Sequence, residues 1–290
     1  MSQDLVGGQA LIEGVMVRRG PTWAAACRQP DGTITTTVQQ SQPSLGAVRQ
    51  IPLIRGTGAL IDSLRIGMSA MRWSRSHAGL EDAAAGSTKE KVVVPLVVGA
   101  VVAVFLFVPL GLAALAEPVV GERYGAAALE GIIRLALFVA YLAMLSRLPG
   151  VQRTLEYHGA EHMVIAAHEH GVPRGVAPAR EFSVRHPRCG TDFFLLIFVI
   201  SIVVFALVGP LPAVWMAISR VALVPVVVGI AYEILRAGGT SHHRRLAAVM
   251  AAPGLMLQHF TTREPSDDQI EVALAALETL VPESASVAHR

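Results

Sequence analysis

The stretch VVVPLVVGAVVAVFLFVPLGLAALA, residues 92–116, contains 25 consecutive residues without a charged side chain. A helix needs about 20 apolar residues to cross the hydrocarbon of a bilayer, so this stretch predicts one membrane span. The whole chain agrees, because 52% of its 290 residues are hydrophobic and only 16% are charged, against about a quarter in soluble domains. The hydrophobic excess is aliphatic rather than aromatic, which favours lipid-facing helices over a transmembrane β-barrel.

Three further apolar stretches predict three more spans. Residues 193–219 are uncharged, but the sequence GPLP at 209–212 breaks helices, so this run holds one whole span and the start of another. The other two spans are expected at Ala126–Leu148 and Ala213–Leu235. The sequence therefore predicts a membrane α-helical fold with four transmembrane helices in two hairpins.

Charged residues within the predicted spans need partners inside the protein. Glu130 and Arg134 are four residues apart, so they can neutralise each other on a face turned toward the helix bundle. Two interpretations stay open. The pair forms a polar binding site or path for a substrate, or it only holds helices together. Arg220 lies at a similar depth in the second hairpin. A transporter is disfavoured, because the four spans include no unwound apolar segment.

The distribution of basic residues predicts the orientation in the membrane. Residues 1–91 contain ten Lys or Arg, residues 147–192 contain six and residues 236–290 contain five, whereas the short connections between spans contain one. Basic segments stay in the cytoplasm, so both termini and all three long segments are expected there. The net charge of +2, without a basic block, argues against a nucleic-acid partner.

The remaining segments predict a small cytoplasmic structure. Short β-prone runs before residue 41, with a turn at Pro30-Asp31-Gly32, predict an antiparallel sheet. Apolar residues with helical spacing at 58–73 predict an amphipathic helix that packs on this sheet rather than on lipid. Ser266 and Gln269 form a capping box that predicts a helix through about Leu280.

These assignments divide the chain into six regions. They are a cytoplasmic β-rich region with its amphipathic helix at 1–75, a linker at 76–91, a first transmembrane hairpin at 92–148, a cytoplasmic segment at 149–192, a second transmembrane hairpin at 193–235, and a cytoplasmic C-terminal helix and tail at 236–290.

The sequence EYHGAEHMVIAAHEHG at 156–171 carries the residues that point to chemistry. It follows Pro149 and is expected to be helical, which places His158 and His162 on adjacent turns of one face, where both imidazoles can bind one metal ion. With Glu161 between them the pattern is H-x-x-E-H, the inverted form of a zinc-protease motif in which the glutamate is a general base. The alternative is a set of surface histidines that bind no metal.

A third ligand is expected from RHPRCGTDF at 185–193, which the topology places at the same membrane face. Cys189 is the preferred donor, because a thiolate and two imidazoles suit zinc or another divalent transition metal. His186 and Glu169 stay open as alternatives, although Glu169 lies about 10 Å along the helix from the second histidine. A cysteine is otherwise often a buried apolar residue. We therefore predict a metal site formed by the two helical histidines and Cys189.

Six strings of the sequence resemble those of one family, the YqhQ-like family of bacterial integral membrane proteins. They are GGQALIEGVMVRRGP, IPLIRGTGALIDSL, EYHGAEHMVI, HPRCGTDF, AYEILR and PGLMLQHFTTREPSDDQIEVA. The family is catalogued as a domain of unknown function and described as predicted metal-dependent enzymes, so the resemblance implies a multi-pass metalloprotein of the bacterial inner (plasma) membrane. The family's motifs fall here on His158, Glu161 and His162 and on Cys189-Gly190-Thr191.

The resemblance also includes Glu13, in the string IEGVM. We favour a Gly-rich turn that enters a strand, in which Gly7, Gly8 and Gly14 supply backbone freedom. The alternative is a buried Glu13 that reaches the metal site.

Residues and resemblance together lead us to expect a metal-dependent hydrolase at the cytoplasmic face of the membrane. Zinc held by the predicted site lowers the pKa of water, and Glu161 accepts the proton. The expected partners are the lipid bilayer and a membrane-associated substrate with a peptide, lipid or amide bond. The alternative is a non-enzymatic membrane scaffold or assembly factor in which a structural ion joins cytoplasmic segments to the helix bundle.

Overall fold

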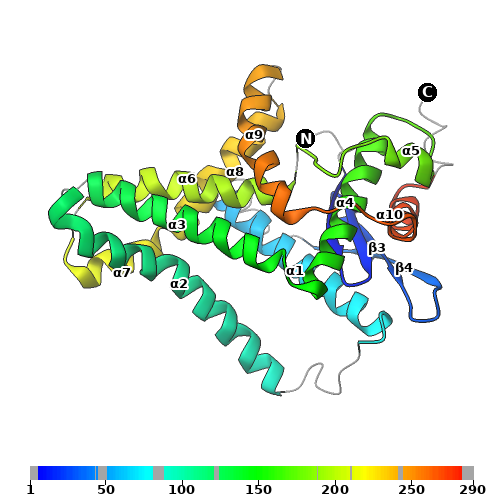
Figure 1. Ribbon diagram of the computed structural model, residues 1–290, viewed down its shortest axis with the longest axis horizontal. Helices are drawn as coiled ribbons and strands as arrows, with labels where there is room; N and C mark the ends of the chain where they lie inside the picture. The colour runs from blue at the N-terminus through cyan, green and yellow to red at the C-terminus, as the bar shows by residue number, and fades with distance from the viewer. Residues whose placement is uncertain are drawn as a thin grey trace.

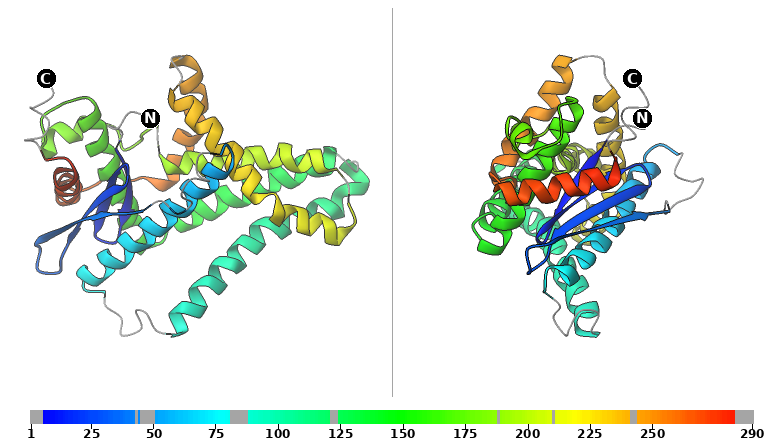
Figure 2. Two further views of the ribbon diagram at one scale, coloured as in Figure 1. Left: turned by 180° about the vertical axis from the view of Figure 1, so that it is seen from behind. Right: turned by 90° about the vertical axis from the view of Figure 1, so that its right-hand side faces the viewer.

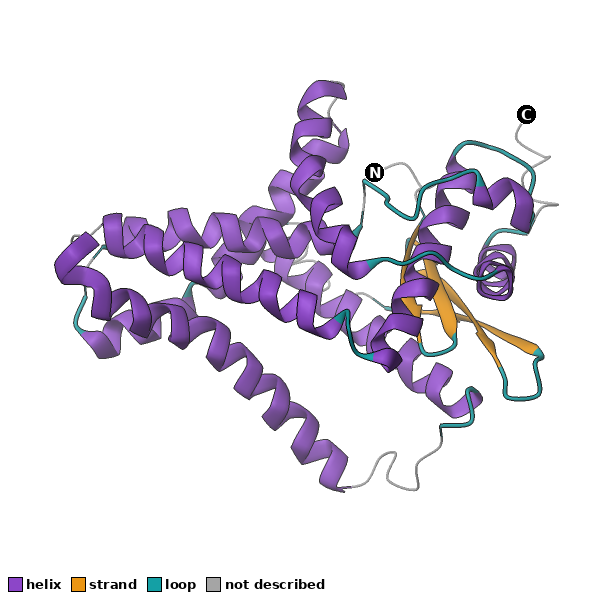
Figure 3. Ribbon diagram, viewed as in Figure 1, coloured by secondary structure: helices purple, strands orange, loops and turns teal. Residues whose placement is uncertain are grey.

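The computed structural model describes residues 6–42, 44, 51–80, 88–120, 124–187, 189–209, 211–240 and 244–282. Within these ranges the chain is mostly helical, and its strands are confined to one end of the molecule (Figure 3). Long apolar helices extend from this end, so the molecule has a membrane part and a part built on a sheet (Figure 1).

The sheet is an antiparallel meander of four strands in sequence order. They are β1 (Gly7–Leu11), β2 (Gly14–Arg19), β3 (Thr22–Arg28) and β4 (Ile34–Gln40). The turn predicted at Pro30-Asp31-Gly32 is confirmed, because it joins β3 to β4 with Gly32 at φ 86°.

The predicted turn that enters a strand at IEGVM is confirmed, but the expected role of Gly7 and Gly8 in this turn was wrong. These residues form β1, pairing with Arg18 and Val17 of β2, because ladder hydrogen bonds need only the backbone. The turn that enters β2 is instead Ile12-Glu13, where Glu13 has a positive φ of 52°.

Helices cover both faces of the sheet (Figure 2). On one face α4 (Pro149–Glu169) and α10 (Asp267–Leu280) bury an apolar core with β2 and β3. The predicted capping box of α10 is confirmed at Ser266. On the other face α1 (Ile54–His77) packs Ile66 and Ala70 against Met16 and Trp23, which confirms the predicted packing of the amphipathic helix.

The same helix α1 joins the sheet to the membrane part. A Cβ added at Gly56 would lie 3.0 Å from the Cα of Gly229, so the glycines allow α1 to approach α8 (Val224–Thr240) closely. Arg55 of α1 forms an ion pair with Glu233 of α8. Glu233, which lies within the last predicted span, therefore has its ion-pair partner on α1.

Within the described residues, three helical segments are long and apolar enough to cross a membrane. They are Val92–Val120 in α2 (Thr88–Val120), Gly125–Leu145 in α3 (Tyr124–Leu145) and Ala213–Ala237, which comprises α7 (Ala213–Ala222) and much of α8. The fourth predicted span corresponds to the shorter apolar segment Phe193–Val208 in α6 (Gly190–Val208).

Further details differ from the predicted regions. The predicted linker is shorter than 76–91, because α1 continues to His77 and α2 begins at Thr88, and residues 81–87 lie outside the described ones. The last span is divided at Leu223, where Pro225 lacks the N–H that a continuous helix needs. The region after 236 contains α9 (Arg244–Thr261) in addition to the predicted helix, and its predicted flexible end beyond Pro282 lies outside the described residues.

Candidate metal centre

Helix α4 carries three of the predicted site residues. It begins at Pro149, whose missing N–H and fixed φ suit the first turn, and it confirms the helix expected from the sequence. His158 and His162 lie one turn apart, and their ring centroids are separated by 4.4 Å. Both rings lie on the side of α4 that faces the loop before α6, so residues distant in sequence can complete a site.

A backbone carbonyl fixes the orientation of each imidazole. Nδ1 of His158 lies 2.7 Å from the carbonyl oxygen of Thr261, and Nδ1 of His162 lies 2.7 Å from that of Val184. A carbonyl oxygen only accepts hydrogen bonds, so Nδ1 of each ring carries the proton. In the neutral ring Nε2 then keeps a free lone pair, which is the arrangement of metal-binding histidines.

Cys189 completes a group of three donors. Its Sγ lies 3.4 Å from Nε2 of His158, and the ligand atoms of His158, His162 and Cys189 all lie within 4.8 Å of one another. A tetrahedral zinc ion, with bonds of about 2.0–2.1 Å to nitrogen and about 2.3 Å to sulfur, holds its ligand atoms roughly 3.3–3.7 Å apart. The 3.4 Å between Cys189 Sγ and His158 Nε2 lies in this range, and two imidazoles and a thiol are the kind of donors that zinc or a similar divalent ion binds.

Glu161 lies beside the same two imidazoles. Its Oε2 is 3.6 Å from Nε2 of His162 and 3.9 Å from Nε2 of His158. Burial raises the pKa of Glu161 to about 8, while His158 acts in the opposite direction. Burial also lowers the pKa of His162 to about 3. Near pH 7 and without a metal, Glu161 is therefore mostly protonated and His162 is unprotonated.

Strand β1 closes one side of the site. A Cβ at Gly8 would lie 2.5 Å from Oε1 of Glu161, so only glycine allows this approach. The three donors, Glu161, Gly7 and Gly8 line a cavity of about 30 Å³. This volume is roughly that of a water molecule or two. The cavity therefore has room for an ion and a water-sized group.

Among the alternative ligands, His186 also lines this cavity, whereas Glu169 and Glu13 do not. His186 Nε2 is 3.2 Å from a carboxylate oxygen of Glu169, so these two residues pair with each other beside the site. The ring of His186 lies 5.7 Å from that of His162. Glu13 binds Arg153 in an ion pair and accepts a hydrogen bond of 3.3 Å from the hydroxyl of Tyr157. The donors that converge are those of His158, His162 and Cys189.

Gln258 of α9 holds the loop that carries Cys189. Its amide oxygen accepts a hydrogen bond of 2.8 Å from the backbone N–H of His186, and its amide nitrogen donates one of 2.9 Å to the carbonyl of the same residue. Gln258 is fully buried. Sequence reasoning missed this residue, because a buried glutamine that binds a backbone has no spacing signal.

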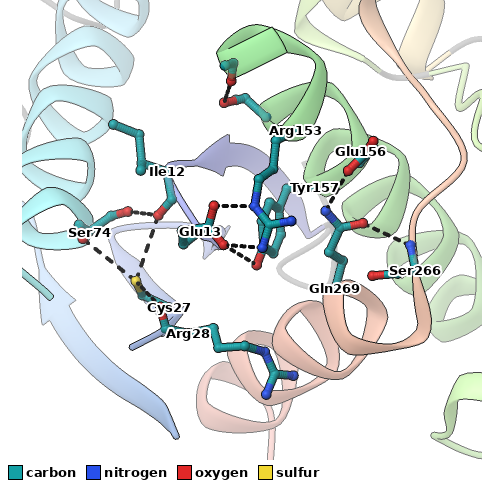
Figure 4. A network of polar contacts seen from close by, with 12 residues as sticks. Ile12, Glu13, Cys27, Arg28, Ser74, Arg153, Glu156, Tyr157, Ser266 and Gln269 are labelled. Atoms are coloured by element: carbon teal, nitrogen blue, oxygen red, sulfur yellow. Dashed lines mark hydrogen bonds and ion pairs between the residues drawn. The ribbon is translucent and has the colours of Figure 1, made fainter. Parts of the chain in front are cut away.

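A polar network anchors the N-terminal half of α4 to the sheet (Figure 4). Glu13 of the β1–β2 turn binds Arg153 and Tyr157 of α4, and the carbonyl of Ile12 in the same turn accepts a hydrogen bond from Ser74 of α1. Gln269 of α10 donates a hydrogen bond of 2.9 Å to Glu156. The β1–β2 turn and α10 thus fix α4, and the two histidines with it, against the sheet.

Comparisons with known proteins give a family but no activity. A family model described as "Protein of unknown function (DUF1385)" matches residues 51–283. The chain is also 34% identical over 292 residues to a protein of Bacillus subtilis (strain 168) described as "Uncharacterized protein YqhQ", covering 95% of this chain and 92% of that protein. No solved structure matches.

Proposed function

The chain belongs to the DUF1385 family, as its YqhQ-like motifs predict, and we propose that it is a metal-dependent hydrolase of the membrane surface. One observation carries the proposal. The imidazoles of His158 and His162 each donate from Nδ1 to a carbonyl, so both Nε2 lone pairs are directed to the place that Cys189 Sγ also reaches. Two imidazoles and a thiol around a small buried cavity form a donor set that suits a divalent metal.

In this proposal each residue has a defined role. His158, His162 and Cys189 hold zinc or another divalent transition metal. When bound, the ion supplies Lewis acidity, which polarises a carbonyl and lowers the pKa of water. Its positive charge also favours the ionised form of Glu161, whose carboxylate lies within 4 Å of both Nε2 atoms. Glu161 then accepts a proton from the attacking water and returns it to the leaving group.

We propose that α6 forms a fourth span and that both termini lie on the cytoplasmic side of the bacterial plasma membrane. With its 19 residues α6 is about 28 Å long, close to the thickness of the hydrocarbon. It packs against α8 through Ile200 and Phe205. The basic residues of the three long segments support this orientation.

The position of the site favours a membrane-associated substrate. Helix α4 follows α3 after a connection of three residues, and Cys189 directly precedes α6. The site therefore lies where two membrane helices end, at the cytoplasmic face in the proposed topology. A scissile peptide, amide or lipid ester bond near the headgroups is within its reach.

The metal content of the purified full-length chain tests the proposal. We expect one equivalent of metal in the wild type by elemental analysis, and loss of that metal in His158→Ala, His162→Ala and Cys189→Ala. His170→Ala and Cys27→Ala are matched controls, because both lie outside the cluster, and they should keep the metal. Equal metal in the ligand and control variants contradicts the proposal.

One observation favours a second function, a scaffold with a structural ion. Because Glu161 Oε2 lies within 4 Å of both Nε2 atoms, Glu161 could serve as a fourth ligand and close the site. The variant Glu161→Gln separates the two functions. A hydrolase keeps its metal and loses turnover in this variant, whereas a closed structural site loses metal affinity.

A further inference from the structure

A second, larger cavity lies among the membrane helices. Its volume is about 480 Å³, within the range of small-molecule sites, and it lies between α2, α3, α6 and α7. Most of its lining is apolar, including Phe107, Leu110, Leu211 and Met216. Its lining includes residues near the C-terminal ends of α2 and α6. These helix ends lie at the end of the bundle opposite α4 (Figure 1).

Three charged side chains are buried beside this cavity. Glu130 of α3 accepts hydrogen bonds of 2.9 and 2.6 Å from Arg220 of α7, and it also binds Arg134. All three residues are 2–3% exposed. Both guanidinium groups also lie over the ring of Phe205, at 5.1 and 4.5 Å from its centroid. Glu130, Arg134 and Arg220 form what we call the arginine cluster, with two positive charges and one negative.

The arginine cluster lies below the membrane surface. Arg220 is the eighth residue of α7, so its Cα is about 10 Å along the axis from the start of that helix. Arginine stays charged at every pH of interest, so the excess positive charge cannot be removed by proton loss. A buried excess charge calls for an anion, and the described residues give the cluster a single carboxylate in direct contact.

Arg220 is the member of the cluster that can meet such an anion. It lines the cavity, whereas Arg134 does not and instead donates to the carbonyl of Phe105 and to Ser201. Of the five N–H groups of Arg220, three have acceptors among the described residues, two on Glu130 and one on Ser219. Its remaining donors suit the oxygens of a phosphate.

A second carboxylate lines the same cavity. Glu117, near the C-terminal end of α2, is half-buried and forms no ion pair within the described part of the chain. The cavity therefore presents a guanidinium and a separate carboxylate within apolar walls. A molecule that carries a phosphate, an ammonium group and hydrocarbon matches all three features.

We propose that this cavity binds a phospholipid headgroup, with the phosphate on Arg220 and the ammonium group of an ethanolamine toward Glu117. Acyl chains continue along the apolar wall into the bilayer. The phosphate supplies the negative charge that the arginine cluster lacks. Phosphatidylethanolamine is then preferred over phosphatidylglycerol, because only the former has a positive group for Glu117.

A pair of glycines in α2 provides matched variants. Gly111 lines the cavity and Gly99 does not, and an added Cβ meets no heavy atom within 4 Å at either position. Gly111→Leu therefore fills the cavity without disturbing the fold, and Gly99→Leu controls for the same substitution on a lipid-facing part of α2. Arg220→Gln leaves Glu130 paired with Arg134, so the remaining charges balance.

Native mass spectrometry of the full-length chain, titrated with phosphatidylethanolamine or phosphatidylglycerol, measures binding. We expect the wild type and Gly99→Leu to bind phosphatidylethanolamine about tenfold more tightly than phosphatidylglycerol. Gly111→Leu and Arg220→Gln should each weaken phosphatidylethanolamine binding about tenfold or more. Glu117→Gln should remove the preference between the two lipids. Size-exclusion chromatography confirms that each variant remains folded.

Three results overturn the proposal. The first is equal lipid binding by folded Gly111→Leu and Gly99→Leu, and the second is equal or tighter wild-type binding of phosphatidylglycerol. The third is displacement of the lipid by an equal concentration of inorganic phosphate, which identifies a site for a free anion instead.

Discussion

The candidate metal centre and the arginine cluster both gather ionisable side chains in a buried place, but they reach charge balance differently. At the metal centre, burial removes the charges, because Glu161 keeps its proton and His162 loses its own. In the arginine cluster the guanidinium groups cannot lose their charge, so Glu130 must balance them. Side chains that can lose protons can bind a metal ion in their place. Guanidinium groups keep their positive charge, so only another ion of opposite charge can balance it.

The largest expected effect is the loss of Glu130. Glu130→Gln leaves two buried guanidinium groups without a carboxylate, so we expect the free energy of unfolding to fall by about 3–5 kcal/mol. Thermal unfolding of the purified chain in detergent measures the change. Glu117→Gln, which removes a carboxylate without an ion-pair partner among the described residues, should lower Tm little. Similar Tm losses in both variants would mean that the ion pairs of Glu130 contribute no more to stability than an unpaired carboxylate does.

The pH dependence of the metal-free chain should show the proton exchange at the metal centre. The pKa of Glu161 rises from 4.5 to about 8 on folding, so its contribution to stability is complete below pH 4.5 and is lost as pH rises toward 8. The Tm of the metal-free wild type should therefore fall over this range by more than that of Glu161→Gln. Glu264→Gln, at an exposed glutamate, is the control and should follow the wild-type profile.

His162 acts in the opposite sense. Its pKa falls from 6.5 to about 3 on folding, so its contribution is complete above pH 6.5 and is lost as the pH falls toward 3. The variant Glu161→Gln should still lose stability as the pH falls toward 3, because His162 is unchanged. Parallel pH profiles of the wild type and Glu161→Gln would show that Glu161 is ionised equally in the folded and unfolded chains.

A smaller effect is expected from Gln258. Gln258→Leu removes both hydrogen bonds that hold the backbone of His186, so the loop that carries Cys189 loses its fixed position. Loss of such a supporting residue lowers metal affinity by about 10–100-fold. Competition with a chelator measures the affinity, and Gln152→Leu, at a more accessible glutamine of α4, is the control. An unchanged affinity would show that the loop is held by other contacts.

The smallest expected effect concerns the approach of β1 to the site. Gly8→Ala places a Cβ 2.5 Å from the carboxylate of Glu161, so that side chain must shift, at a cost of about 1–3 kcal/mol. Gly7→Ala is a close control, because an added Cβ there meets nothing within 4 Å. Chemical unfolding compares the two variants. A Gly8→Ala chain as stable as Gly7→Ala would mean that β1 and Glu161 are not in close contact.

The elements with strong local signals could be predicted from the sequence. The apolar run at 92–116, the capping box at Ser266 and the helical spacing of His158 and His162 each depend on residues close in sequence. The grouping of Cys189 with the histidines could also be predicted, because the predicted membrane topology places their segments on one side.

Other features depend on contacts that no local pattern encodes. Strand β1 begins with two glycines and is specified by its pairing with β2 and by the space that Glu161 needs. The carbonyls of Thr261 and Val184 orient the histidines, but any residue type can supply a carbonyl. The bond between Glu130 and Arg220 spans 90 residues, whereas the predicted partner Arg134 is only one helical turn away.

X-ray absorption spectroscopy at the metal edge of the purified chain identifies the atoms that bind the metal. We expect one sulfur at about 2.3 Å and two imidazole nitrogens at about 2.0–2.1 Å, with the sulfur signal lost in Cys189→Ser. A bound metal with only oxygen neighbours, or a sulfur signal that survives Cys189→Ser, contradicts this expectation.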